Sequence, residues 1–172
     1  HEQTKFDGSG WFYCRDFMIG SRAPKLVGIW AEFDDVSGTI TLRHQDCGEI
    51  TFNPDQDDAA FLAWVAPLCP ADRAAPKAIV KAEGRGRTDS EIPSVSVTNR
   101  SSHEAVESAI GHPLEMERWR ANIWLDGIDA WDELDWVGKK IRIGEAELEV
   151  REPIVRCLAT ATNPVTGVRD TD

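Results

Sequence analysis

The segment WRANIWLDG, residues 119–127, places an arginine and an asparagine among apolar residues that are typical of a buried strand. Side chains of a strand alternate between its two faces, so Arg120, Asn122 and Trp124 would share one face. The guanidinium of arginine is a planar fork of donors suited to phosphate, and the amide of asparagine offers both a donor and an acceptor. Taken alone, the segment is most simply interpreted as a half-exposed strand with one solvated side, and a face that holds a ligand is the alternative.

A second candidate for chemistry is the pair Arg156–Cys157, which precedes the segment LATATNP. A deprotonated cysteine is a soft metal ligand and a sulfur acceptor, and nearby guanidinium groups of Arg156 and Arg120 would favour that charged form. On a regular strand Arg156 and Cys157 point to opposite faces, so both reach one ligand only where the strand ends or bulges. The alternative for Cys157 taken alone is a small buried apolar side chain.

The other cysteines and the histidines show no metal-binding spacing. Cysteines stand at 14, 47, 69 and 157 and histidines at 1, 44, 103 and 112, without a CxxC pair. Four cysteines in a chain of this length do not make a disulfide scaffold, and no leader is visible. We therefore interpret Cys14, Cys47 and Cys69 as buried thiols and expect a cytoplasmic protein.

Length and composition describe an ordinary globular chain. It has 172 residues, of which 41% are hydrophobic and 28% are charged, and its formal net charge is −11. No apolar run approaches the roughly 18 residues of a membrane span. The negative charge would repel a polyanion, so neither a membrane span nor nucleic acid as a partner is expected.

The first half of the chain is predicted to combine short strands with two helices. The segments LVGIWAEF (26–33) and TITLRH (39–44) flank the turn-rich DDVSG, which indicates a hairpin. A helix capped by Asn53 is expected to end at Pro70. Next come a strand over 77–83, a glycine-rich loop over 83–91 that orders over a bound ligand, a strand over 94–98, and a short helix with Ser101 and Glu104 as capping box and Gly111 at its end.

The second half is predicted to be a series of short strands. They are RANIWL (120–125), KKIRI (139–143), AELEV (146–150) and PIVRCLATAT (153–162), with WDELDW (131–136) as a solvated acidic turn. Short strands at close spacing favour a barrel, and the helices are interpreted as insertions and not as layers of an alternating βαβ fold. We expect one α+β domain over 1–172, predominantly β, with a looser part (1–75) and a core (76–172).

The motifs of the second half resemble the C-terminal pattern of the MOSC domain family, the molybdenum cofactor sulfurase C-terminal domain. That pattern has an arginine and an asparagine two residues apart, a W-x-G turn into a basic and apolar hairpin, and an arginine–cysteine pair followed by threonines, an N/D-P turn and G-x-R-D. The chain carries these elements in order, as RANIWLDG, WDELDWVGKKIRIGEAELEV and EPIVRCLATATNPVTGVRD. The resemblance is specific from about residue 88 to 170 and looser upstream.

The resemblance implies a MOSC-type β-barrel with one or two short inserted helices and a site for the pterin molybdenum cofactor. By comparison with the related amidoxime-reducing proteins, Cys157 would be the molybdenum ligand. The implied cofactor contacts are Arg120, Asn122, Arg156, Thr88, Asp89, Ser90, Thr160 and Asp170. The family is also associated with pyridoxal phosphate binding.

Three functions remain open on this basis. One is a molybdenum-dependent reductase of N-oxygenated small molecules, which would take electrons from a separate protein because the chain has no ferredoxin, flavin or nicotinamide motif. Another is a sulfur carrier in which Cys157 receives a persulfide from a donor protein. The last is a non-catalytic binding module, because a lysine–serine motif near the N-terminus and a glycine-rich final strand of fuller members have no equivalent here. These departures leave open a chain that is truncated at both ends.

Overall fold

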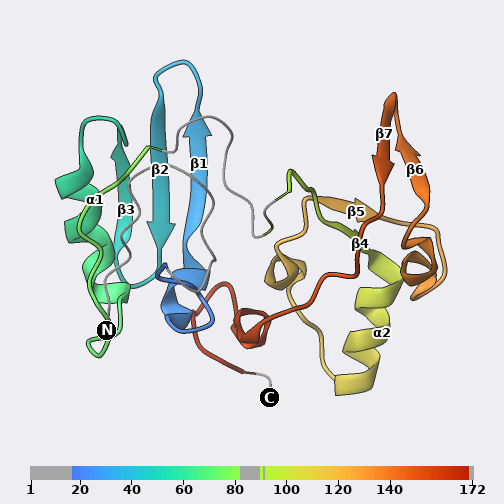
Figure 1. Cartoon of the computed structure of the whole chain (residues 1–172). Coiled ribbons are helices and arrows are strands. Elements are labelled where there is room, and N and C mark those ends of the chain that lie inside the picture. Colours follow the sequence, from blue (N-terminus) through green and yellow to red (C-terminus); the bar gives the residue numbers. More distant parts are fainter. Residues whose placement is uncertain (1–16, 82–89, 91, 171–172) are drawn as a thin grey trace. The chain divides into compact units, whose positions relative to one another are not determined.

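The computed structural model describes residues 17–81, 90 and 92–170. The described chain forms two compact units (Figure 1). Unit one comprises the residues up to Pro93 together with those from Leu158 onward, and unit two comprises Ser94–Cys157. The expected single domain stays a prediction.

Unit one is built on an antiparallel sheet of three sequential strands, β1 (Trp30–Asp34), β2 (Thr39–His44) and β3 (Gly48–Phe52). The predicted hairpin is confirmed as β1 and β2. At its turn the Asp34 carboxylate accepts hydrogen bonds from the Ser37 hydroxyl and the Val36 amide, which hold the pKa of this carboxyl below its usual range. Arg43 on the central strand bridges Glu32 and Glu49 of its two neighbours and so ties the three strands together.

Helix α1 (Asp58–Val65) packs against β3 through a stack of Phe52 and Phe61, whose ring centroids lie 5.3 Å apart. It begins four residues later than expected, with Asp57 and not Asn53 at the cap position. Asn53 does not cap it, because its side-chain oxygen accepts the Asp55 amide in a local turn. A 3₁₀ turn, η3 (Ala66–Leu68), extends the helix towards Pro70. The strand expected over 77–83 is wrong for its described part, since residues 77–81 have no regular structure.

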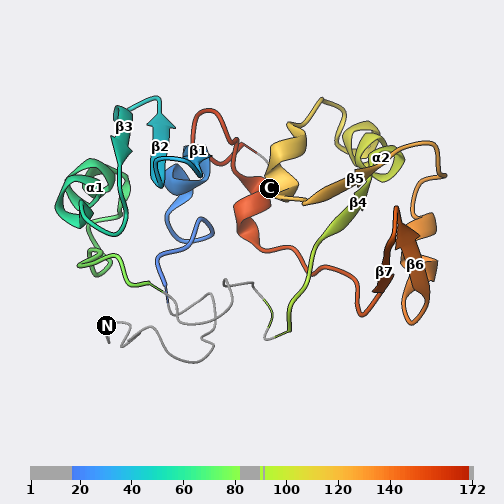
Figure 2. The ribbon, with the colours of Figure 1, turned by 90° about the horizontal axis from the view of Figure 1, so that it is seen from above.

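Unit two contains a parallel pair of strands, β4 (Val97–Asn99) and β5 (Ile123–Leu125), joined through α2 (Arg100–Ile110). Figure 2 shows the two strands side by side with α2 next to them. This βαβ arrangement corrects the interpretation of the helix as an insertion. The helix is capped by Asn99, whose side chain accepts the Ser101 amide, and not by Ser101 as expected. Its predicted end at Gly111, with φ of 83°, is confirmed.

The hairpin of β6 (Lys140–Ile143) and β7 (Ala146–Glu149) turns at Gly144 and confirms the sequence prediction. The strand expected over 153–162 is wrong. Residues 150–157 have no regular structure, and Leu158–Ala161 is a 3₁₀ turn, η6. The described strands lie in three separate sheets and form no closed barrel, so the mixed α and β class is confirmed and the barrel is not.

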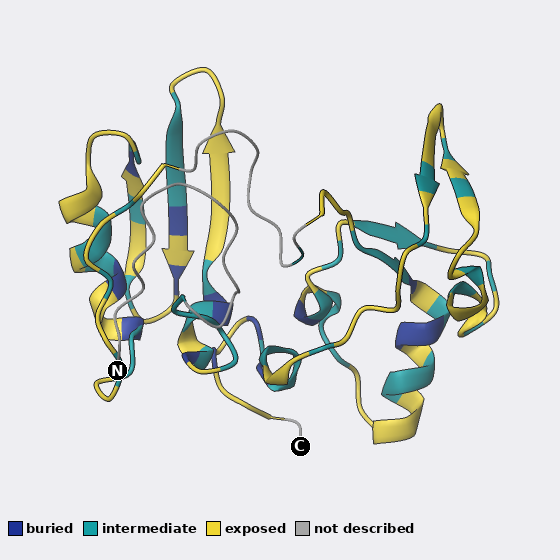
Figure 3. Ribbon diagram, viewed as in Figure 1, coloured by how far each residue is buried: buried dark blue, intermediate teal, exposed yellow. Residues whose placement is uncertain are grey.

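The described buried side chains of unit two are polar, whereas unit one buries hydrophobic side chains together with His44 and Thr162 (Figure 3). In unit one the buried hydrophobic residues are Ala23, Val27, Leu42, Phe52, Val65 and Leu68. In unit two the buried positions are occupied by Asn99, Ser102, His103 and Arg118. Polar groups removed from water must find partners, so hydrogen bonds determine the interior of unit two. None of the described helices is long and apolar enough to cross a membrane.

Candidate functional site

Arg120 lies at the end of a 3₁₀ turn and not on a strand. The turn η4 (Met116–Trp119) closes with the Arg120 amide donating to the Glu117 carbonyl at 3.1 Å, and Arg120 has a left-handed backbone with φ of 50°. Strand β5 begins only at Ile123, so the expected alternation of Arg120, Asn122 and Trp124 on one strand face is wrong. A left-handed backbone is strained for arginine, and such strain is often found where a side chain is aimed at a functional site.

Asn122 fastens the segment after Arg120 to the start of β4. Its side-chain oxygen accepts the Ser96 amide at 2.9 Å and the Ser96 hydroxyl at 3.0 Å, while its own backbone amide donates to the Ser96 carbonyl at 3.2 Å. The acceptor of the Asn122 amide is therefore used within the fold. Its Nδ2 donates to no described group of the protein, and Asn122 is exposed, so this donor is accessible to solvent or to a ligand.

Arg156 joins the same region from a distant part of the chain. Its guanidinium Nη1 donates to the Trp119 carbonyl at 2.7 Å, one residue before Arg120. Cys157 follows it and is exposed. Because residues 150–157 are irregular, no strand geometry forces Arg156 and Cys157 to opposite sides. Within unit two the structure thus gathers Arg120, Asn122 and Arg156 around one turn, with Cys157 next to Arg156 in the chain.

The remaining predicted contacts lie elsewhere. Thr88 and Asp89, with most of the predicted loop over 83–91, lie outside the described residues. Ser90 donates its hydroxyl to the Ile92 carbonyl at 2.9 Å. Thr160 is half-buried in η6, and the Asp170 amide donates to the Ala161 carbonyl at 3.1 Å. These three residues belong to unit one, so their sharing a site with Arg120 stays a prediction.

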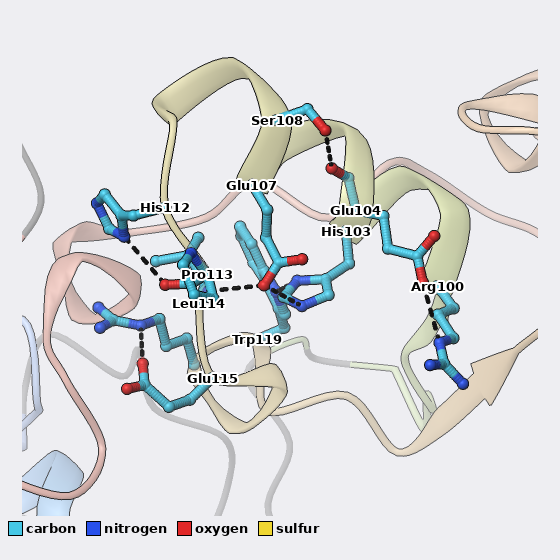
Figure 4. A network of polar contacts seen from close by, with 11 residues as sticks. Arg100, His103, Glu104, Glu107, Ser108, His112, Pro113, Leu114, Glu115 and Trp119 are labelled. Atoms are coloured by element: carbon cyan, nitrogen blue, oxygen red, sulfur yellow. Dashed lines mark hydrogen bonds and ion pairs between the residues drawn. The ribbon is translucent and has the colours of Figure 1, made fainter.

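Two residues that the sequence did not single out support the turn at Arg120. The Trp119 indole donates to His103 Nδ1 at 2.9 Å, and His103 is only 6% exposed on α2 (Figure 4). The sequence signal was weak, because a single histidine on a helix is usually an ordinary side chain. Arg118 is also buried and donates to the Glu115 carboxylate at 2.7 Å, which balances its charge.

The described thiols differ in their surroundings. Cys47 and Cys69 are half-buried, and burial raises the pKa of each of these two thiols. Cys157 is exposed. Among the residues that the structure describes, no cluster of three or more His, Cys, Asp or Glu side chains could hold a metal ion.

This difference predicts the order of alkylation. With limiting iodoacetamide at neutral pH, Cys157 should be modified well before Cys69 and Cys47, because access and thiolate formation both limit the reaction of a buried thiol. Peptide mass mapping over time, on the chain carrying Cys14→Ser, measures the three rates. Equal rates for Cys69 and Cys157 would contradict the placement of Cys157 at the surface.

A known protein family matches the part of the chain that contains Arg120, Asn122, Arg156 and Cys157. Residues 89–169 match the model of the MOSC domain. This segment is similar to the MOSC domain, as the motifs of the sequence predicted. The matched range includes Arg120, Asn122, Arg156 and Cys157, and it covers the whole of unit two and part of unit one. MOSC domains are associated with the molybdenum cofactor, and this association supports a function related to that cofactor. No curated protein matches the chain significantly.

Proposed function

We propose that this protein binds the molybdenum cofactor, with Cys157 as the ligand of the metal, and reduces N-oxygenated small molecules with electrons from a separate donor protein. The observation that carries the proposal is the hydrogen bond from Arg156 to the Trp119 carbonyl. It brings the arginine–cysteine pair to the turn that bears Arg120 and Asn122. These are the positions at which the chain and the family pattern agree.

The residues of this turn fit the chemistry of the group. A pterin phosphate needs cationic donors, which Arg120 and Arg156 provide, and a pterin edge needs a donor such as Asn122 Nδ2. Molybdenum in this cofactor lies among sulfur ligands, to which a thiolate adds more naturally than a carboxylate or an imidazole. When bound, the cofactor supplies the redox chemistry of the metal. The protein binds the phosphate, orients the pterin through Asn122 and offers the Cys157 sulfur.

A sulfur carrier is the second candidate, and the exposure of Cys157 favours it. An irregular, exposed segment lets a donor protein approach the thiol. The Cys157 thiolate would attack the outer sulfur of a donor persulfide, forming a sulfur–sulfur bond as the donor leaves as a thiolate. The sulfur would then pass to a thiolate of another protein by the same exchange, with Cys157 leaving as a thiolate.

The amounts of molybdenum, pterin and sulfane sulfur in the purified wild-type protein test both candidate functions. The chain is expressed in a host that makes molybdenum cofactor, and molybdenum, pterin and sulfane sulfur are measured per chain. About one molybdenum and one pterin per chain would support the reductase proposal, whereas sulfane sulfur without metal would support the carrier. A protein with neither would contradict both and favour a non-catalytic binding module.

Replacing Arg120 tests the predicted phosphate contact. Arg120→Ala should lower pterin retention about tenfold to a hundredfold, because it removes a charge-assisted hydrogen bond worth roughly 1.5 to 3 kcal/mol. Arg120→Gly should lose the pterin equally but unfold at a higher denaturant concentration than Arg120→Ala, because glycine adopts the left-handed backbone without strain.

The matched control is Arg142→Ala, which removes an exposed arginine from β6 of the same unit. It should leave pterin retention unchanged, because it changes the net charge by the same amount away from the turn. Equal pterin content in Arg120→Ala and the wild type would remove Arg120 from the site.

A further inference from the structure

The hydrogen bond between His103 and Trp119 defines the protonation of a buried imidazole. An indole N–H can only donate, so His103 Nδ1 must be the acceptor and carries no proton. The single ring proton of the neutral imidazole is then on Nε2, which lies 3.4 Å from Glu107 Oε1. The same Glu107 oxygen accepts the Leu114 amide at 2.7 Å, as Figure 4 shows. Glu107 therefore links α2 to the segment that leads into η4, and His103 links α2 to Trp119 of η4.

Ring packing leaves His103 little freedom to turn. Its ring meets Trp119 edge-on, with centroids 6.2 Å apart and an interplanar angle of 83°. It meets Trp124 of β5 in the same manner, at 5.8 Å and 79°. A ring that is held by two aromatic neighbours and a hydrogen bond keeps one orientation, and it keeps the Trp119 indole in one orientation as well.

Trp119 connects His103 to the candidate site by direct contacts. Its indole is fixed by His103, its carbonyl accepts the Arg156 guanidinium at 2.7 Å, and the next residue is Arg120 in the left-handed conformation. The position of the Trp119 backbone therefore determines the orientation of the Arg156 guanidinium. It also determines the direction in which the Arg120 side chain leaves the turn. A tilt of the indole would move the carbonyl and loosen both arginines.

We propose that His103 is a positioning residue of the candidate site, which acts through Trp119 to hold Arg120 and Arg156 in place for an anionic ligand. The identity of that ligand rests on the proposed function, but the positioning of the two arginines does not. In this role His103 does not itself contact the ligand. Its contribution is the Nδ1 acceptor, so any side chain that supplies an acceptor at that point should preserve the site.

Two substitutions separate this role from simple packing. His103→Phe keeps a ring of similar size but removes the acceptor, whereas His103→Asn loses the ring but places an oxygen near the position of Nδ1. A positioning role predicts that the turn at Arg120 is more rigid in the asparagine variant than in the phenylalanine variant. A packing role predicts the reverse order, because the aromatic contacts with Trp119 and Trp124 depend on the ring.

Amide hydrogen exchange at Arg120, Asn122 and Ile123 measures the rigidity of the turn without any ligand. His103→Phe should speed this exchange about tenfold, the effect of losing one buried hydrogen bond, and His103→Asn should restore most of the protection. Trp119→Phe, which lacks the indole donor, should resemble His103→Phe and serves as a second variant if His103→Phe does not fold. Nitrogen NMR of the wild type should show the ring proton of His103 on Nε2.

Pterin retention by the same variants gives a second readout, with loss in His103→Phe and recovery in His103→Asn. Unchanged exchange in both His103→Phe and Trp119→Phe, a phenylalanine variant more protected than the asparagine variant, or a proton on Nδ1 would overturn the proposal. A wild type without pterin, with the exchange pattern as expected, would overturn the proposed function and leave the positioning role supported.

Discussion

Replacing Cys157 with serine is expected to lower the molybdenum content of the purified protein by about tenfold or more relative to the wild type, while the chain stays folded. The hydroxyl of serine is a hard donor that remains protonated at neutral pH, so it replaces neither a thiolate ligand nor a sulfur acceptor. Cys157 is exposed in an irregular segment, so the substitution opens no buried cavity. Metal analysis and a sulfane sulfur assay at equal protein concentration measure the loss.

The matched controls are Cys47→Ser and Cys69→Ser. Both residues lie in unit one, and their thiols are protonated at neutral pH because burial raises the pKa of each. These variants should keep molybdenum or sulfane sulfur at the wild-type level. Retention of both in Cys157→Ser, or a loss in Cys69→Ser as large as in Cys157→Ser, would reject Cys157 as the site.

The structure brings three of the predicted cofactor contacts close together, but in a geometry other than the expected one, and their common role stays a prediction. Arg120, Asn122 and Arg156 meet around one turn, as a common site requires, although the strand that was expected to align Arg120 and Asn122 begins only at Ile123. The alternation of polar and apolar residues could not show where the strand begins. The left-handed backbone of Arg120 and the hydrogen bond from Arg156, which is distant in sequence, interrupt the strand. Side-chain alternation applies only where a ladder continues.

The elements that were predicted correctly are those with strong local signals. The hairpins at 30–44 and 140–149 have turn residues between alternating segments, and Gly111 ends its helix in the left-handed conformation. The strand over 153–162 failed because its apolar residues carry no information about a partner strand. The parallel pairing of β4 with β5 was missed for the same reason, since it joins residues 26 positions apart.

The helix cap shows how a tertiary contact can override a local motif. Ser101 and Glu104 match a capping box, yet Asn99 caps α2. Asn99 is fully buried and uses its whole side chain: Oδ1 accepts the Ser101 amide, and Nδ2 donates to the Asp129 carbonyl at 2.8 Å and to Glu133 Oε2 at 2.9 Å. The sequence near Ser101 does not indicate that Asn99 has hydrogen-bond partners 30 or more residues away.

This asparagine is the centre of a buried polar network that holds the start of α2 to a second 3₁₀ turn, η5 (Asp132–Trp136). The other oxygen of Glu133 accepts the Ser102 hydroxyl at 2.7 Å, and that hydroxyl accepts the Trp131 amide at 2.8 Å. The WDELDW segment, interpreted from the sequence as a solvated acidic turn, therefore has one carboxylate directed inward. Its other acidic residues, Asp132 and Asp135, are exposed as expected.

Asn99→Ala should consequently lower the free energy of unfolding of the protein by about 2 to 4 kcal/mol. The lost helix cap costs about 1 kcal/mol, and the carboxylate and carbonyl left without a donor cost about 1 to 3 kcal/mol more. Asn99→Ser keeps a capping oxygen but no amide donors, so it should recover only the cap. Ser108→Ala, on the exposed side of the same helix, should change stability by less than about 0.5 kcal/mol.

Urea unfolding of the three variants, followed by circular dichroism, gives the free energies, and hydrogen exchange of η5 locates the loss. Faster exchange at Leu134 in Asn99→Ala and in Asn99→Ser would assign the larger part of the effect to the bonds with Asp129 and Glu133. If Asn99→Ser were as stable as the wild type, the cap alone would account for Asn99. The anchoring of η5 would then have to come from Ser102, whose hydroxyl contacts both Glu133 and the Trp131 amide.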